Sequence, residues 1–233
     1  MMFSRDLRAW AREALRGHWL VAVAVSVVSG LLAGGIDMVS AVFQESSQNE
    51  AFGMLDLAAN DAWPLMVTVT VASLLVALVI GGAVTLGVAH YFTNLTAYRP
   101  SKFTDLFARF RIWHKGVWMS IVMAFFIFLW SLLFVIPGII AAYRYAMVPY
   151  LIAEFPDLTV MDAMRESKRL MCGNKWRLFC LNFSFIGWIF VAMLTFGVGF
   201  LWIEPYMQAA NAAFYLEVTG RSGLRYPQPG QEL

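Results

Sequence analysis

The sequence predicts an all-α, polytopic membrane protein with six transmembrane helices in three hairpin units, each preceded by an amphipathic interfacial helix. The prediction rests on composition, on long apolar stretches and on the distribution of charge between loops. Of the 233 residues, 60% are hydrophobic and 14% are charged, whereas soluble domains carry about 25% charged residues. A soluble core of this size could not bury so much apolar surface, so the composition indicates a membrane protein.

The apolar stretches have the lengths of membrane spans, since a helix needs about 20 apolar residues to cross a bilayer. The last four form two pairs, and the turn residues Ile136-Pro137-Gly138 and Gly197-Val198-Gly199 divide them. The first stretch follows a basic region, but it exceeds the about 7–15 apolar residues of a signal peptide, which favours a membrane helix. The predicted spans are 19–36, 64–92, 117–136, 138–154, 176–195 and 198–217.

The loops between these spans differ in charge. Residues 37–62 contain acidic residues and neither Lys nor Arg, whereas sixteen of the seventeen basic residues fall on the opposite side of a six-span arrangement. The positive-inside rule places that basic side in the cytoplasm. We therefore expect a bacterial inner-membrane protein with cytoplasmic N- and C-termini and an outer loop at 37–62. The net charge of +2 and the lack of a basic-aromatic motif argue against a nucleic-acid partner.

The chain is predicted to be one membrane domain, residues 1–233, built from three related units. Each unit places a glycine two or three residues before a tryptophan at the start of a span, in ALRGHWL, HKGVWMS and CGNKWRL. The basic segments that precede these tryptophans are predicted to be helices lying in the cytoplasmic membrane interface. The units cover roughly 1–98, 99–156 and 157–220, followed by a short polar tail at 221–233, and the basic segments are 4–16, 103–113 and 160–172.

Each basic segment also carries an apolar stripe, which we expect to face the membrane. Small residues at helical spacing in the first two spans, Gly30 with Gly34 and Ala83 with Gly87, predict close helix packing. The three stripes consist of Phe3, Leu7, Trp10 and Ala14, then of Phe103, Phe107 and Phe110, and then of Met161, Met164 and Met171.

No catalytic or metal-binding constellation is visible. The nucleotide-binding and hydrolase motifs GxxxxGK[ST], GxSxG and HExxH are missing, and the three histidines lie far apart at predicted span ends. Cys172 and Cys180 show no metal-ligand spacing, which predicts plain thiols. We therefore expect no catalytic residue, no cofactor and no metal, and a protein that is not an enzyme.

Polar residues inside the predicted spans are the candidate functional residues. A charge at the bilayer centre costs about 2.5–3.5 kcal/mol, so such residues usually face the bundle interior and have a partner. They are Glu204, Gln208, Asn211 and Tyr215, which share one face of the last span, with Tyr143, Arg144, Tyr150 and Glu154 in the fourth span and Asn182 in the fifth.

Two interpretations of this intramembrane polar seam stay open. It either lines a cavity for a substrate or ion, or it supplies hydrogen bonds between helices while Arg144 and Glu204 reach the outer interface. Pro149 and Pro205 favour the cavity, because a proline frees backbone carbonyls inside a helix. Arg144 and Glu204 follow the two turns at similar distances, roughly 8–10 Å below the outer surface. This spacing predicts that they form an ion pair.

Several short motifs carry a resemblance to a known family. IPGII, Tyr-Arg-Tyr, Pro-Tyr, Pro-Asp-Leu, Gly-Asn-Lys-Trp and Phe-Ser-Phe-Ile-Gly-Trp follow one another between residues 130 and 215. Together they resemble a bacterial membrane family catalogued as domain of unknown function 975, and AREALRGHW resembles that family's start. The resemblance covers nearly the whole chain except 40–62. It implies a multispanning bacterial membrane protein and no particular chemistry.

These observations favour a non-enzymatic role in which the seam binds or moves a lipid-like or small amphiphilic molecule. The alternative is a scaffold or accessory subunit for another membrane protein. The expected partners are membrane lipids and, for the alternative, that second membrane protein. A membrane enzyme is the least supported class, because no acid-base pair or nucleophile stands out.

Overall fold

A computed structural model describes residues 3–32, 59–133, 135–195 and 197–221. Within these ranges the chain is helical and contains no strand, which confirms the predicted all-α class. The helices are α1 (Ser4–Leu15), Trp19–Leu32, α3 (Ala59–Thr96), α4 (Asp105–Ala108), the 3-10 turn η2 (Phe110–Ile112), α5 (Trp113–Leu133), α6 (Val135–Tyr145), α7 (Val148–Glu154), α8 (Val160–Leu170), α9 (Lys175–Phe183), α10 (Ile186–Leu194) and α11 (Phe200–Val218).

The described residues contain four segments long and apolar enough to cross a membrane, against six predicted spans. A fifth is added if α1 and Trp19–Leu32, which meet at a bend of 101°, count as one span. α11 is not among them, because Glu204, Gln208 and Asn211 lower its mean hydropathy. The predicted outer loop at 37–62 lies outside the described residues, apart from its last four. The four segments are Leu78–Thr96, Asp105–Leu132, Ile136–Glu154 and Lys175–Leu194.

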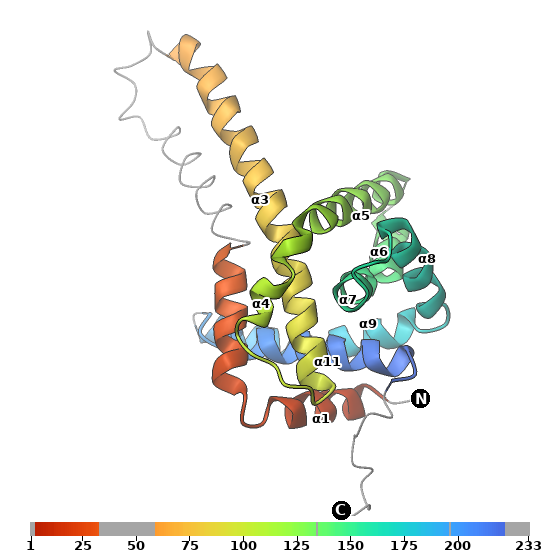
Figure 1. Ribbon diagram of the computed structural model, residues 1–233. Coiled ribbons are helices and arrows are strands. Elements are labelled where there is room, and N and C mark those ends of the chain that lie inside the picture. Colours follow the sequence, from red (N-terminus) through yellow and green to blue (C-terminus); the bar gives the residue numbers. More distant parts are fainter. Residues whose placement is uncertain (1–2, 33–58, 134, 196, 222–233) are drawn as a thin grey trace, which may run out of the picture.

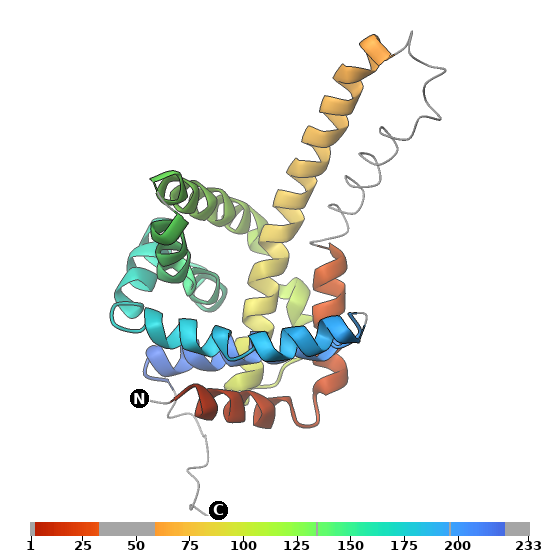
Figure 2. The same cartoon turned by 180° about the vertical axis from the view of Figure 1, so that it is seen from behind.

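The arrangement of the helices differs from three parallel hairpins. The axes of Trp19–Leu32 and α3 lie along the same general direction, with the chain running in opposite senses, whereas α1 and α11 run across them (Figures 1 and 2). The first and last described helices therefore lie against each other at one end of α3. Ala209, Ala210, Ala212 and Ala213 of α11 are all fully buried, and side chains this small let neighbouring helices approach closely.

Two of the three predicted surface segments are single helices. Residues 4–16 contain α1 and residues 160–172 contain α8, but 103–113 is divided between α4 and η2, because the backbone leaves the helical region at Arg109. Their orientation relative to a membrane stays a prediction. On α8, the Arg169 guanidinium donates to Glu166 at 2.9 Å and lowers the pKa of that carboxyl.

The apolar stripe of α1 faces the protein and not lipid, which corrects the prediction for this segment. Leu7, Trp10 and Ala14 are buried, and the Trp10 indole donates to the Thr96 carbonyl oxygen at 3.1 Å. Phe3 alone of the predicted stripe is exposed. The third stripe is also mostly internal, since Met164 and Met171 are buried and Met161 is exposed. The second stripe is the outward one, with Phe103 and Phe107 exposed and Phe110 half-buried.

Glycines set the closest helix contacts. A Cβ added at Gly82 of α3 would lie 2.6 Å from the carbonyl carbon of Gly116 in α5, and one at Gly87 would lie 1.9 Å from the Leu106 carbonyl oxygen. The predicted close packing at Gly87 is thus observed. A Cβ at Gly30 would meet nothing within 4 Å, so Gly30 makes no close contact of this kind, and Gly34 lies outside the described residues.

Candidate functional site

The predicted polar seam divides into three separate groups. α11 places Glu204, Gln208, Asn211 and Tyr215 along its length, and each group combines some of them with residues of α7 or α9. Helical spacing explains why the α11 residues share a face. The turn at Ala146–Met147 separates α6 from α7. It therefore determines which side chains of these two helices lie next to α11.

The first group borders a cavity of about 560 Å³ between Trp19–Leu32, α3, α7 and α11. Its walls are mostly apolar, while Glu204, Gln208 and Tyr150 supply polar groups. Glu204 accepts a hydrogen bond from the Gln208 amide at 3.0 Å, and it forms no ion pair with any described residue. Ser26 also lines the cavity, and its hydroxyl is buried without a hydrogen-bond partner among the described residues. The cavity therefore offers a carboxylate without a counterion.

The second group borders a smaller cavity of about 200 Å³, lined by Tyr143, Tyr150, Asn182 and Asn211. The side-chain oxygens of Asn182 and Asn211 are buried and have no hydrogen-bond partner within the described part of the chain. An unsatisfied buried polar group costs about 1–3 kcal/mol. These two oxygens can therefore accept hydrogen bonds from a molecule in the cavity. Tyr150 lines both cavities.

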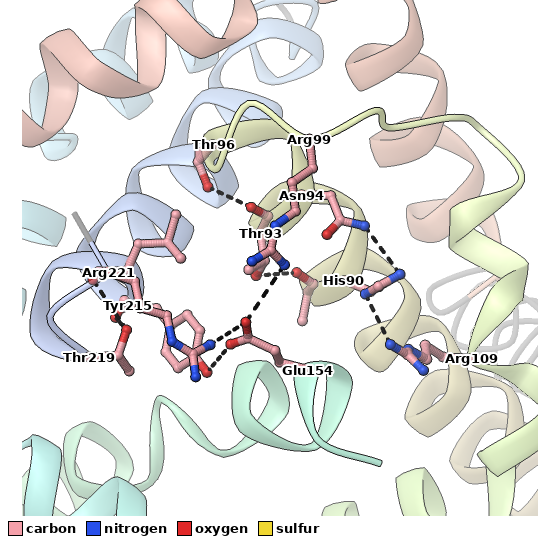
Figure 3. Close-up of polar contacts among 12 residues, drawn as sticks. His90, Thr93, Asn94, Thr96, Arg99, Arg109, Glu154, Tyr215, Thr219 and Arg221 are labelled. Carbon is pink, nitrogen blue, oxygen red and sulfur yellow. Dashed lines mark hydrogen bonds and ion pairs between the residues drawn. The ribbon is translucent and has the colours of Figure 1, made fainter. Parts of the chain in front are cut away.

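The third group is an ionic network around Glu154, at the end of α7 (Figure 3). The Tyr215 hydroxyl donates to the carboxylate at 2.7 Å, Arg221 forms an ion pair with it, and Arg99 lies 3.8 Å away. The Glu154 side chain is only 13% exposed. These contacts tie the ends of α3, α7 and α11 together, which gives Glu154 and Tyr215 a structural role.

The predicted ion pair between Arg144 and Glu204 is wrong. Arg144 lines neither cavity, and its Nε is buried with no hydrogen-bond partner in the described part of the chain. Its backbone carbonyl accepts from the Ser167 hydroxyl at 2.9 Å. The prediction assumed two parallel hairpins with residues at equal depth. In the structure α11 runs across α3, and a turn interrupts the helix between α6 and α7. Similar distances from a turn in the sequence therefore do not bring these two residues together.

A different ion pair, which sequence reasoning missed, joins α9 to α11. Arg177 Nη2 lies 2.7 Å from both carboxylate oxygens of Glu217, and the Glu217 side chain is only 9% exposed. The guanidinium also stacks over the Phe214 ring at 5.6 Å. Both charges lie at the same end of two predicted neighbouring spans. This shared position is the feature of the sequence from which the ion pair could have been predicted.

His90 forms a second missed polar group, with residues before and after the loop that follows α3 (Figure 3). Arg109 Nη2 lies 3.3 Å from His90 Nδ1, and the Asn94 amide lies 3.2 Å from Nε2. A guanidinium can only donate, so Nδ1 accepts this hydrogen bond. This arrangement is a hydrogen-bonded brace. The described residues contain no group of three or more His, Cys, Asp or Glu suited to a metal.

The fold and the cavities define a helical protein with membrane-compatible segments and a partly polar interior. Residues 132–222 match the model of a family described as "Protein of unknown function (DUF975)", which confirms the predicted resemblance over this segment. The match covers α6 to α11, whereas AREALRGHW lies outside it. Comparison with curated proteins and with solved structures gave no match.

Proposed function

We propose that this chain is a non-enzymatic membrane protein that binds a small amphiphilic molecule with a cationic head in the larger cavity. The observation that carries the proposal is Glu204, a carboxylate that faces this cavity without a counterion among the described residues. The volume and the mostly apolar lining of the cavity suit a small-molecule site, which typically measures about 300–1,000 Å³ and has few polar groups.

The lining separates the two parts of such a molecule. Val84, Val88 and Phe200 offer apolar surface to a hydrocarbon tail, while Glu204 and Gln208 can bind the head. An ammonium head is favoured over a neutral one, because a charge-assisted hydrogen bond is roughly twice as strong as a neutral one. The second cavity extends the path. It shares Tyr150 with the first and offers two amide oxygens as further acceptors, which supports movement of the head along α11.

An alkylamine tests this proposal. We expect dodecylamine to bind the purified protein and raise its midpoint of thermal unfolding, whereas dodecanol, which has the same chain length, has a smaller effect. Glu204→Gln is expected to weaken dodecylamine binding about tenfold and to leave dodecanol binding unchanged, since one charge-assisted contact is worth about 1.5–3 kcal/mol. Isothermal titration measures both affinities.

The matched control is Glu13→Gln, which removes an exposed carboxylate on α1 and should change neither affinity. Equal loss of amine binding in the Glu13 and Glu204 variants would contradict the site. A failure of both ligands to bind would instead favour the alternative role, a scaffold for another membrane protein.

We further propose that the chain lies in a bacterial inner membrane with both termini cytoplasmic and with the predicted six spans, because sixteen of its seventeen basic residues fall on one side of a six-span arrangement. Single cysteines at Glu50 and Thr104, in a background where Cys172 and Cys180 are replaced by serine, test this in intact cells. An impermeant thiol reagent should label position 50 and reach position 104 only after permeabilisation. The opposite pattern would refute the orientation.

A third cysteine, at the exposed Val198 between α10 and α11, decides the number of spans. Labelling in intact cells would place this turn outside, as the six-span prediction requires. Protection would leave α11 on the cytoplasmic side.

A further inference from the structure

Three arginines of α1 face two aromatic residues from the far end of the chain. Arg5, Arg8 and Arg12 surround a pocket of about 330 Å³ together with Trp188 of α10 and Tyr206 of α11. The arginines follow steps of three and four, so one side of α1 presents all of them. This pocket is distinct from the proposed amphiphile site, because Tyr206 points away from the face of α11 that carries Glu204 and Gln208.

The three guanidinium groups have no acidic partner within the described part of the chain. The acidic residues of α1 are already engaged: Asp6 accepts from the Phe3 backbone N–H at 3.0 Å, and Glu13 pairs with Arg16 at 3.3 Å. On α8, by contrast, Arg165 and Arg169 both form ion pairs with their own helix. The concentrated positive charge of α1 is therefore free to bind an anion.

The pocket is held in a fixed geometry by contacts on both of its sides. The Tyr206 hydroxyl donates to the Arg8 carbonyl oxygen at 3.3 Å. On the opposite face of α1, Leu7, Trp10 and Ala11 are buried in the core. The arginine side of α1 consequently cannot roll away from Trp188, so the binding groups are arranged before any ligand arrives.

We propose that this pocket binds the phosphate of an anionic membrane phospholipid. Arginine recognises phosphate through paired hydrogen bonds, and tryptophan is enriched at headgroup depth in membranes. The surface next to the pocket favours a lipid as the source of the phosphate. Trp188, Phe190, Val191 and Leu194 of α10 are all more than half exposed, and they offer an apolar surface to the acyl chains.

Lipid binding to the full-length protein in neutral detergent tests the proposal. Native mass spectrometry would compare dioleoyl phosphatidylglycerol with the zwitterionic dioleoyl phosphatidylcholine, which has the same acyl chains. We expect the phosphatidylglycerol dissociation constant to rise at least about tenfold when Arg5, Arg8 and Arg12 are all changed to Gln, since each basic residue adds measurably to attraction for an anionic surface. Phosphatidylcholine binding should be weaker and little changed.

The control removes the same charge elsewhere, through Lys102→Gln, Arg111→Gln and Lys168→Gln, three exposed cations without an ion pair to described residues. An equal loss in this control would show diffuse attraction and overturn the site. Displacement of the lipid by millimolar inorganic phosphate would also overturn the lipid assignment, because the pocket would then be a free-anion site.

If the Gln variant does not fold, changing the same arginines to Lys keeps the charge but removes the paired hydrogen bonds. Phosphatidylglycerol binding is then expected to weaken by about threefold. An unchanged affinity in the Lys variant would count against recognition by guanidinium groups.

Discussion

Replacing Gly82 by alanine is expected to destabilise the protein by about 1–3 kcal/mol, whereas the same change at the neighbouring Gly81 is expected to be neutral or stabilising. A Cβ at Gly82 would lie 2.6–2.8 Å from backbone atoms of Gly116 and Val117, so α3 and α5 would have to separate. A Cβ at Gly81 meets nothing within 4 Å, and alanine is better than glycine in a helix interior by up to about 1 kcal/mol.

Thermal unfolding in detergent, followed by circular dichroism, measures both changes. Gly87→Ala should destabilise at least as much as Gly82→Ala, because its Cβ would lie 1.9 Å from the Leu106 carbonyl oxygen. Gly116→Ala should resemble Gly82→Ala, since the two glycines pack on each other. Equal midpoints for the Gly81 and Gly82 variants would contradict the described packing of α3 on α5.

Removing either partner of the Arg177–Glu217 ion pair is expected to cost about 2–4 kcal/mol. Breaking one side of a buried pair leaves an uncompensated charge, at a typical cost of about 3–5 kcal/mol. The partial exposure of Arg177, at 22%, reduces that figure. Arg177→Gln and Glu217→Gln should each lower the free energy of unfolding. The double variant should lose clearly less than the sum, since neither charge is then left alone.

The control for this double-mutant cycle is the pair Arg144 and Glu204, which the sequence predicted to be coupled and the structure separates. Their Gln variants should be additive within about 0.5 kcal/mol, as expected for sites without a shared contact. A coupling of Arg144 with Glu204 as large as that of Arg177 with Glu217 would overturn the arrangement of α6 and α11.

Composition and periodicity were sufficient for the class of fold but not for the breaks inside helices. The turn before α11 was predicted correctly, because glycines mark it, whereas Ile136-Pro137-Gly138, predicted as the other turn, lies inside α6. The predicted span 138–154 is instead two helices, α6 and α7, and Pro149 lies at the start of the second. A proline lacks the backbone N–H that would continue the helical hydrogen bonds of α6, and it is well placed in a first helical turn. The sequence analysis expected Pro149 to disturb one continuous span, whereas the structure has two separate helices there.

The candidate site was predictable along one helix and not between helices. Glu204 and Gln208 were placed on one face by spacing alone, and the structure joins them by a hydrogen bond. Partners across helices depend on the crossing of α11 over α3, and that crossing depends on buried alanines and on the burial of α1. Hydropathy carries no information on such angles, so the charge pair was assigned to the wrong residues.

The packing of α1 on α11 has a consequence for biosynthesis. A chain is made from its N-terminus, so α1 emerges long before α11, one of the helices that it packs against. During that interval Leu7, Trp10 and Leu15, which are buried in the finished structure, need another cover, and the bilayer surface is the nearest one. We expect the nascent segment to rest on lipid as an amphipathic helix. Its packing against the protein is complete only when translation has reached α11.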